Sequence, residues 1–307
     1  MKILYLAGTG RSGSTILGRV LAESPGFFMA GEISRLWNRI VLGRHVCGCS
    51  KHLPDCPFWS EVFAEAFGGF PGVDPGQMKD RLEQSARNRH LMMRFLPGRR
   101  DAGDRSDQAP AEELRRLYRA IARVSGCRVI IDTSKGPSYA RLLAERVGME
   151  IHGLHLVRDP RGVSFSWSRT KAHPVTGEFL ARMTWAKSTL DWVGLNLLAE
   201  RMDFGLGRSL PYLRVRYEDF AAHPWAVVRR IQSWLGEGAA RGPAGESPVI
   251  ALGPGHAVSG NPNRYDVGRI ELRPDEEWRQ RMHPGRKLMI LALTWPLMIR
   301  YGYSICG

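Results

Sequence analysis

The sequence predicts an α/β fold of three layers, with helices covering both faces of a central parallel sheet. Short apolar runs typical of buried strands alternate with stretches of helical periodicity, beginning with Ile3–Ala7 and Thr15–Leu21. A glycine-rich turn lies between these two segments. Polar motifs follow the predicted strands at their carboxyl ends, where parallel sheets bind ligands.

The other elements follow in order along the chain. The apolar residues 27–29 predict a short strand that leads into Gly31-Glu32. Apolar runs that end in polar residues predict further strands at 128–131, 151–157 and 212–216. Residues 236–263, rich in glycine and proline, are expected to form a long loop. Periodicity predicts helices at 57–67, 75–96, 111–124, from about 162, 180–201, 225–235, 275–282 and 288–299.

One domain is expected over the chain. Its 307 residues could form one large α/β domain or two small ones, and 43% hydrophobic and 24% charged residues are usual for a globular protein. The motifs described below fall in residues 1–35 and 128–307. We therefore predict a single domain, 1–307, with a helical insertion at about 36–127.

Charge and hydropathy narrow the class of partner. The formal net charge is +14, and most of the basic residues are arginines spread along the whole chain. An anionic cofactor or acceptor accounts for this charge as well as nucleic acid would. Charge is the only feature that supports a nucleic-acid-binding protein, so we expect no nucleic acid as partner. The apolar residues 288–299 are too short to span a bilayer and contain Pro296, so we expect a helix packed on the core and no transmembrane segment. The first strand begins at Lys2, which leaves no room for a signal peptide and predicts a cytoplasmic protein.

Five cysteines, an odd number, do not suggest a disulfide framework. Three thiols lie close together in the sequence, with two histidines beside them, and such a set could hold zinc. Their spacing is not that of a zinc ribbon, so we expect a surface loop with free or redox-active thiols and assign no metal ligand. The residues concerned are Cys47, Cys49, Cys56, His45 and His52. The other two cysteines are expected to be small core residues, Cys127 and Cys306.

The turn at residues 8–15 has the pattern of a phosphate-binding loop without its lysine. Gly8 and Gly13 hold the two glycine positions and Thr15 the hydroxyl position, but Ser14 stands where a nucleotide-triphosphate loop has lysine. Arg11 is the one cation in the loop. A strand, a tight turn and a helix start direct backbone N–H groups at one point, so the loop suits an anion. The missing lysine argues against the β,γ-phosphates of ATP.

Residues 11–15 resemble the 5′-phosphosulfate loop of sulfotransferases that use 3′-phosphoadenosine 5′-phosphosulfate (PAPS). The tyrosylprotein sulfotransferases come closest, and many bacterial sulfotransferases share the pattern. The resemblance implies a P-loop-like fold, PAPS as co-substrate and 3′,5′-ADP as product. It also implies that the donor is bound by Arg11, Ser12, Gly13, Ser14 and Thr15.

A second motif resembles the 3′-phosphate site of the same enzymes. Arg158 follows a predicted strand and Ser166 lies one helix turn into the next helix. The resemblance implies that both grip the 3′-phosphate. Alone, the motif would equally suit a strand-turn-helix with a salt bridge and proline at the first helical position. A further basic residue of the family has no clear match here, with Arg169 and Lys171 as open candidates.

Glu32 follows a strand beside the loop, 21 residues after Arg11. The resemblance implies that it is the general base that deprotonates the acceptor hydroxyl. The structural alternative is a helix cap or a surface glutamate paired with Arg35. His173 is the rival base, because cytosolic sulfotransferases use a histidine.

The strand that ends at Asp132 is ambiguous. Its four residues Val129–Asp132 look like a Walker B strand with a magnesium carboxylate, which together with the loop suggests an ATP-dependent kinase as the alternative function. The resemblance instead assigns Lys135, three residues later, to the bridging oxygen of the departing 3′,5′-ADP. Asp132 would then orient Lys135. This scheme needs no metal, because lysine and arginine neutralise the transferring group.

Two later segments also resemble family motifs. Tyr217 lies in a Tyr-Glu-Asp segment that borders the nucleotide, although a tyrosine that ends a buried strand is common. The late Gly-Asn-Pro loop resembles the loop that covers the adenosine and its 3′-phosphate. Its candidate ligands are Ser259, Arg264 and Arg269.

The acceptor is expected to be a hydroxyl of a small molecule or a lipid-like natural product. The insertion at 36–127 and most of the loop at 236–263 carry no donor motif, and both connect to strand ends. We therefore expect them to frame the acceptor pocket, with residues 97–110 as a lid. The apolar walls could come from side chains that equally suit a core. These are Trp37, Phe58, Trp59, Met92, Met93 and Phe95.

Overall fold

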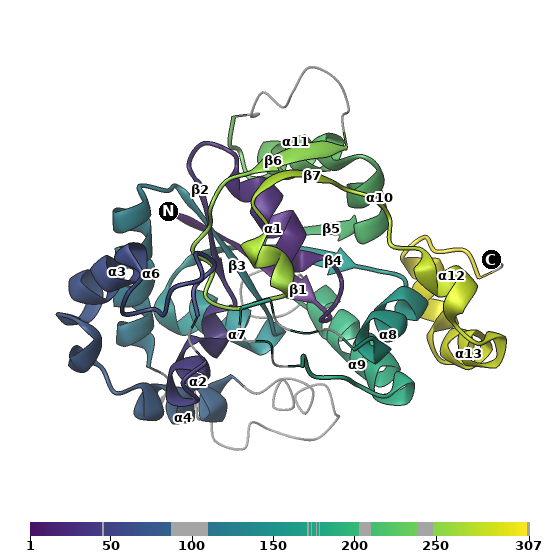
Figure 1. Ribbon diagram of the computed structural model, residues 1–307, viewed down its shortest axis with the longest axis horizontal. Coiled ribbons are helices and arrows are strands. Elements are labelled where there is room, and N and C mark those ends of the chain that lie inside the picture. Colours follow the sequence, from purple (N-terminus) through teal and green to yellow (C-terminus); the bar gives the residue numbers. More distant parts are fainter. Residues whose placement is uncertain are drawn as a thin grey trace.

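The computed structural model describes residues 1–44, 46–86, 110–170, 172, 174–175, 177, 179–202, 210–238 and 248–305. A five-stranded parallel sheet forms its centre, in the order β2-β3-β1-β4-β5. The strands are β1 (Lys2–Gly8), β2 (Phe27–Gly31), β3 (Val129–Lys135), β4 (Glu150–Val157) and β5 (Tyr212–Arg216). Figure 1 shows this sheet between helices, and the predicted α/β fold is confirmed.

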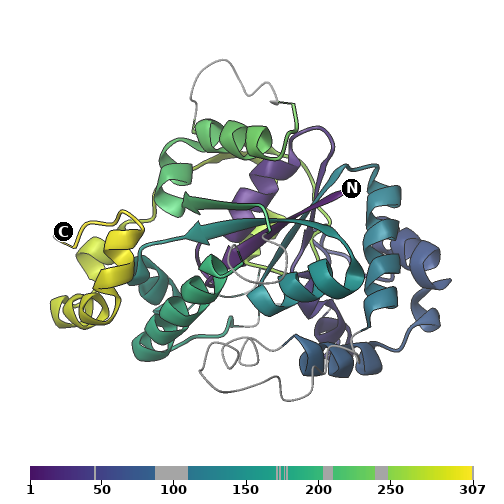
Figure 2. The same ribbon diagram turned by 180° about the vertical axis from the view of Figure 1, so that it is seen from behind.

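Successive residues of β1 point to opposite faces of the sheet, and each face has its own core. Leu4 and Leu6 pack with α1 (Ser14–Ala22) and α11 (Pro224–Trp234). Ile3 and Tyr5 pack on the other side with the helices of the insertion. Figure 2 shows α11 and α9 on opposite sides of β4 and β5. The short α10 and the helices after β3 and β4 complete the layers: α10 (Tyr217–Ala222), α7 (Pro137–Leu142), η4 (Leu143–Val147), α8 (Pro160–Ser168) and α9 (Trp185–Glu200).

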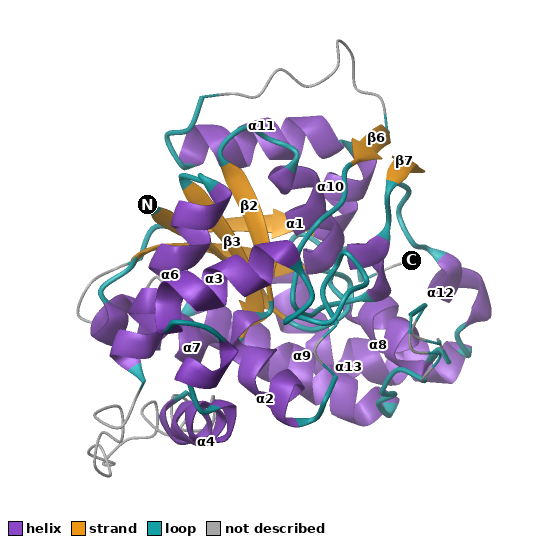
Figure 3. Cartoon of the chain, turned by 60° about the vertical axis from the view of Figure 1, so that its left-hand side comes forward, coloured by secondary structure: helices purple, strands orange, loops and turns teal. Residues whose placement is uncertain are grey.

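Figure 3 shows the helices of the insertion beside the sheet. Their buried side chains belong to the same core cluster as Ile3 and Tyr5 of β1. Trp37 and Trp59 are fully buried in the same cluster as Ile3, so neither lines a pocket. The structural alternative for these two residues is therefore correct, while Met92, Met93 and Phe95 lie outside the described residues. The elements of the insertion are η1 (Ile33–Arg35), α2 (Leu36–Val41), α3 (Pro57–Phe67), η2 (Phe70–Gly72), α4 (Pro75–Ser85) and α6 (Ala111–Ser125).

Two predicted boundaries differ from the structure for local reasons. β3 continues past Asp132 to Lys135, since Ala7 of β1 pairs with Lys135. The helix predicted at 180–201 begins only at Trp185, because Thr184 caps it by accepting a hydrogen bond from the Lys187 amide. The described part of the helix predicted at 75–96 ends at Ser85.

The predicted loop 236–263 contains a strand, which its glycine and proline content concealed. β6 (Val249–Leu252) pairs antiparallel with β7 (Gly268–Glu271). In β6 exposed and buried residues alternate, which is the period of a strand with one buried face. The prediction of an uninterrupted loop over 236–263 was therefore wrong at β6.

The chain ends in η5 (Pro262–Tyr265), α12 (Glu277–Arg281) and α13 (Pro284–Arg300), and α13 includes Pro296. One face of α13 packs inward through Ile290, Thr294 and Met298. The opposite face exposes large apolar side chains, so only part of the apolar stretch packs on the core as expected. They are Leu288, Met289, Leu293, Trp295 and Ile299. No described helix has the length and apolarity needed to cross a membrane.

Candidate functional site

The loop between β1 and α1 is shaped by backbone conformations that favour glycine. Gly8 and Gly13 have φ values of 128° and 89°. A Cβ on Gly13 would lie 2.5 Å from the ring of Tyr217, so only glycine permits this contact. Arg11 also has a positive φ, 67°, and Thr9 and Ser12 share a hydrogen bond of 2.8 Å between their hydroxyls. The loop is thus a tight turn that ends at the N-terminus of α1.

Arg11 lies among partners from three other segments. Its guanidinium is 4.8 Å from the ring centroid of Trp167 on α8, and it donates a hydrogen bond to the Asn261 side chain. Burial lowers the pKa of Arg11, and the charge of Glu32 opposes this shift. The loop cation therefore lies close to the carboxylate at the end of β2.

Arg158 contacts the backbone of the loop. Its Nη1 donates to the Arg11 carbonyl oxygen at 3.0 Å, and its guanidinium is 4.5 Å from the ring centroid of Tyr217. Asp275 forms ion pairs with both Arg158, at 3.1 Å, and Arg169, at 3.0 Å. Burial raises the pKa of Asp275, but the two arginines outweigh it and the net shift is downward. Two predicted donor-binding motifs, Arg11 and Arg158, are thus brought together with Tyr217.

The rest of the second motif forms the expected turn. Asp159 caps α8, accepts from the Arg161 amide at 2.8 Å and pairs with the Arg161 guanidinium at 2.8 Å. Pro160 holds the first helical position. Ser166 is buried within α8. The structural features of the alternative are present, and the binding role of Arg158 and Ser166 stays a prediction.

Glu32 and Lys135 meet at the carboxyl ends of neighbouring strands. Lys135 donates a hydrogen bond to one carboxylate oxygen of Glu32, and Arg35 pairs with the other at 3.1 Å. Glu32 is buried, and burial alone would raise its pKa. The charges of Lys135 and Arg35 outweigh burial, so the net pKa of Glu32 is lowered. The side chain is therefore an ionised carboxylate at neutral pH.

Lys135 occupies a strained backbone conformation, with a φ of 70°. Neighbouring contacts hold it in place. The Asp132 carboxylate accepts from the Ser134 amide at 2.8 Å, and the Ser134 hydroxyl accepts from the Ser34 amide at 3.0 Å. Tyr5 donates to the Gly136 carbonyl at 2.7 Å. These bonds fix the end of β3 against β1 and η1.

Asp132 is fully buried, and its second carboxylate oxygen accepts a hydrogen bond from the Tyr118 hydroxyl. Burial raises its pKa to about 6, although hydrogen bonds from Ser134 and Tyr118 favour the ionised form. Both carboxylate oxygens are thus engaged by the protein. This arrangement suits the positioning role that the sequence suggested and not a magnesium ligand.

We predict that Tyr118→Phe destabilises the protein by about 1.5–3 kcal/mol where Asp132 is ionised, because a buried carboxylate loses a hydrogen bond. Since the pKa of Asp132 is about 6, the loss should be larger well above pH 6 than well below it. Urea unfolding at both pH values measures this difference. Tyr139→Phe is the control. It removes a neighbouring buried hydroxyl, 3.3 Å from that of Tyr118, and leaves the Tyr118 hydroxyl that donates to Asp132 in place. An equal loss for Tyr118→Phe at both pH values would contradict the prediction.

The segment 256–264 lies across the site. Val258 donates its amide to the Ala30 carbonyl at 3.0 Å, and Ser259 donates to Glu32 at 3.4 Å. Asn261 donates its amide to the Thr15 hydroxyl at 3.1 Å. Arg264 is buried and donates to the Gly260 and Val46 carbonyl oxygens at 3.2 and 3.3 Å. Of the candidates in this segment, Ser259 contacts Glu32, and Arg264 stabilises the segment through its hydrogen bonds to the backbone.

The remaining predicted site residues lie away from the loop or outside the described residues. Arg269 is exposed on β7, in the separate two-stranded sheet. His173 and Lys171 lie outside the described residues. Among the contacts of Arg11 and Arg158, sequence reasoning did not single out Trp167, Asn261 or Asp275. Asn261 lies in the Gly-Asn-Pro motif and could have been found from it.

Comparisons with known proteins identify the family and the fold of the chain. A family model described as "Sulfotransferase family" matches residues 4–239. The sulfotransferase domain from the curacin biosynthetic pathway has a similar fold, with a TM-score of 0.52 and 17% identity over 98% of this chain and 97% of that chain. The sulfotransferase domain from the Synechococcus PCC 7002 olefin synthase has a TM-score of 0.51 and 19% identity over 97% and 94%. A search of curated proteins found no match.

Proposed function

The chain belongs to the sulfotransferase family, and we propose that it transfers the sulfuryl group of PAPS to a hydroxyl of a small molecule or lipid-like natural product. One observation carries the proposal: the ionised Glu32 and the cation of Lys135 meet beside the loop that ends at α1. These two groups supply the base and the leaving-group cation that direct sulfuryl transfer requires.

The residues around the loop fit an anionic nucleotide as substrate. Gly13 leaves room for Tyr217 against the loop, and Arg158 donates to the Arg11 carbonyl, so two guanidinium groups flank the turn. In our proposal Arg11 and the amides of residues 12–15 bind the phosphosulfate. Arg158 and Ser166 bind the 3′-phosphate, for which Arg158 exchanges its partner Asp275.

The proposed transfer is a single displacement at sulfur. The acceptor oxygen forms a bond to sulfur while the bond from sulfur to the 5′-phosphate oxygen breaks. Glu32 takes the hydroxyl proton, and Lys135 donates a hydrogen bond to the departing oxygen of 3′,5′-ADP. The Glu32–Lys135 hydrogen bond must open for this step, which frees one carboxylate oxygen and one cation at the same moment.

We place the acceptor between the insertion, about 36–127, and the loop 236–263, within one domain of residues 1–307. In support, η1 leads from Glu32 directly into the insertion, and Ser259 contacts Glu32 from the late loop. Incubation with labelled PAPS and a metabolite extract tests the acceptor class. Labelling of oligosaccharides or peptides alone would refute a small-molecule or lipid-like acceptor.

A thermal-shift experiment tests the donor. We predict that 3′,5′-ADP at a 100-fold excess over its Kd stabilises the protein by about 2.7 kcal/mol. At the same concentration AMP should stabilise the protein much less, because it lacks the 3′-phosphate. ATP with magnesium should also stabilise it much less, because Ser14 replaces the loop lysine and both Asp132 oxygens are engaged. An equal or larger shift with ATP and magnesium would revive the kinase alternative and contradict the donor assignment.

A further inference from the structure

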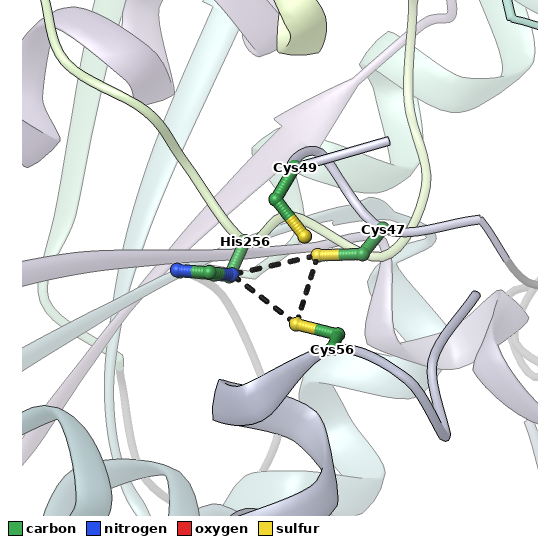
Figure 4. Close-up of side chains that lie close together, drawn as sticks. All are labelled: Cys47, Cys49, Cys56 and His256. Carbon is green, nitrogen blue, oxygen red and sulfur yellow. Dashed lines mark hydrogen bonds between the residues drawn. The ribbon is translucent and has the colours of Figure 1, made fainter. Parts of the chain in front are cut away.

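Four potential metal ligands converge next to the transfer site. Figure 4 shows the side chains of Cys47, Cys49, Cys56 and His256 pointing toward one another. Their ligand atoms all lie within 4.8 Å of each other. The Sγ atoms of Cys47 and Cys56 are 3.6 Å apart, and His256 Nδ1 is 3.6 Å from the first and 3.3 Å from the second. A tetrahedral zinc ion holds neighbouring sulfur and nitrogen ligands about 3.5–3.8 Å apart.

We propose that these residues bind a structural Zn²⁺ through three thiolates and the Nδ1 atom of His256. Three cysteines and one histidine form a closed tetrahedral set, which leaves no position for a substrate. On binding, the three thiols release their protons to solvent, so the loaded site has a net charge of about −1. Arg19 lies against Gly255, beside the site, where its cation offsets this charge.

Backbone contacts build the site in advance of any metal. Gly48 donates its amide to the Ala257 carbonyl at 3.0 Å, and a Cβ on Gly48 would lie 2.7 Å from the Gly255 oxygen. Trp59 donates to the His256 carbonyl at 2.7 Å, and the Phe58 ring stacks on the His256 ring with centroids 5.2 Å apart. The two segments are therefore held together by backbone approach, and His256 is oriented by its neighbours.

Burial corrects one part of the expectation of a surface loop with free or redox-active thiols, namely its place at the surface. Cys47 and Cys56 are fully buried. The histidine of the set is His256, since His52 is exposed and His45 lies outside the described residues. His256 is 200 residues from Cys56 in the sequence, so its part in the cluster could not be read from spacing.

The ion would join the insertion to the segment that crosses the transfer site. His256 is followed directly by the residues that contact Ala30, Glu32 and Thr15. Zinc at His256 would therefore fix the position of Ser259 over Glu32. This consequence for catalysis rests on the proposed function, whereas the metal site itself does not.

Metal analysis of the purified protein, expressed with zinc, tests the site. We expect about one zinc per chain, and Co²⁺ substitution should give thiolate-to-metal charge-transfer absorption. Cys49→Ser is the informative variant, because Cys49 is only partly buried and serine has nearly the same shape. It should lose most of the zinc, while the matched control Cys127→Ser keeps it. A wild-type protein without zinc, a Cys47–Cys56 disulfide, or equal zinc in both variants would overturn the proposal.

Hydrogen exchange gives a second readout. After zinc is removed by a chelator, amides of residues 256–261 should exchange faster, while those of β4 keep their protection. Unchanged exchange at 256–261 would show that the ion does not hold this segment. Neither measurement uses PAPS, so a failure of the proposed function would leave both results interpretable.

Discussion

Glu32→Gln should lower kcat by about 10²-fold or more and leave the affinity for 3′,5′-ADP nearly unchanged. The amide keeps the shape of the side chain but cannot accept the acceptor's proton. In the wild-type protein burial raises the pKa of Glu32, but the charges of Lys135 and Arg35 lower it by more. The carboxylate is therefore ionised and available at neutral pH. Steady-state kinetics and 3′,5′-ADP titration measure the two effects separately.

The variant also changes stability in a predictable direction. A carboxylate whose pKa is lowered on folding contributes stability above its unfolded pKa, and this contribution is lost as the pH falls through the folded pKa. Glu32→Gln should therefore be less stable than the wild type at neutral pH, and the difference should shrink at acid pH. Nucleotide binding shows that the variant is folded.

His173→Ala is the matched comparison for the base. This histidine lies outside the described residues and is the rival that sequence reasoning left open. If His173→Ala lowers kcat with normal 3′,5′-ADP binding and Glu32→Gln does not, the base is misassigned.

The parts of the site that sequence could predict are those carried by short, local motifs. The loop at residues 8–15 has a spacing that fixes a strand, a turn and a helix start, and the structure has these elements. Glu32 and Lys135 each follow a strand, and adjacent parallel strands bring their carboxyl ends together. This arrangement brings the two residues to the same edge of the sheet, and the structure adds the hydrogen bond between them.

The parts that sequence could not predict are contacts between distant loops. Asp275 joins Arg158 and Arg169, and His256 joins the cysteines of the insertion, but no periodicity or spacing links these residues. The apolar character of Trp37 suited a pocket wall as well as a core. Only the packing of the insertion on the sheet decided between them.

Lys135→Met should lower kcat by about 10²–10³-fold, because the departing phosphate oxygen loses the hydrogen-bond donor that stabilises its developing charge. Methionine keeps the length of the side chain and removes its charge. Lys187→Met is the control, because Lys187 forms an exposed ion pair with Asp191. Wild-type kcat in Lys135→Met would contradict the role of Lys135 in the transfer step.

The same variant should move the pH profile in a direction that a merely structural lysine would not produce. Lys135 is the largest charge that lowers the pKa of Glu32, so its loss raises that pKa toward neutrality. The fall of kcat/KM on acidification should then begin at a higher pH in Lys135→Met than in the wild type. Because the two side chains are in direct contact, Glu32→Gln and Lys135→Met should also be non-additive in a double-mutant cycle. Additive losses together with an unshifted profile would mean that the two residues act independently, and the coupled roles proposed for them would fail.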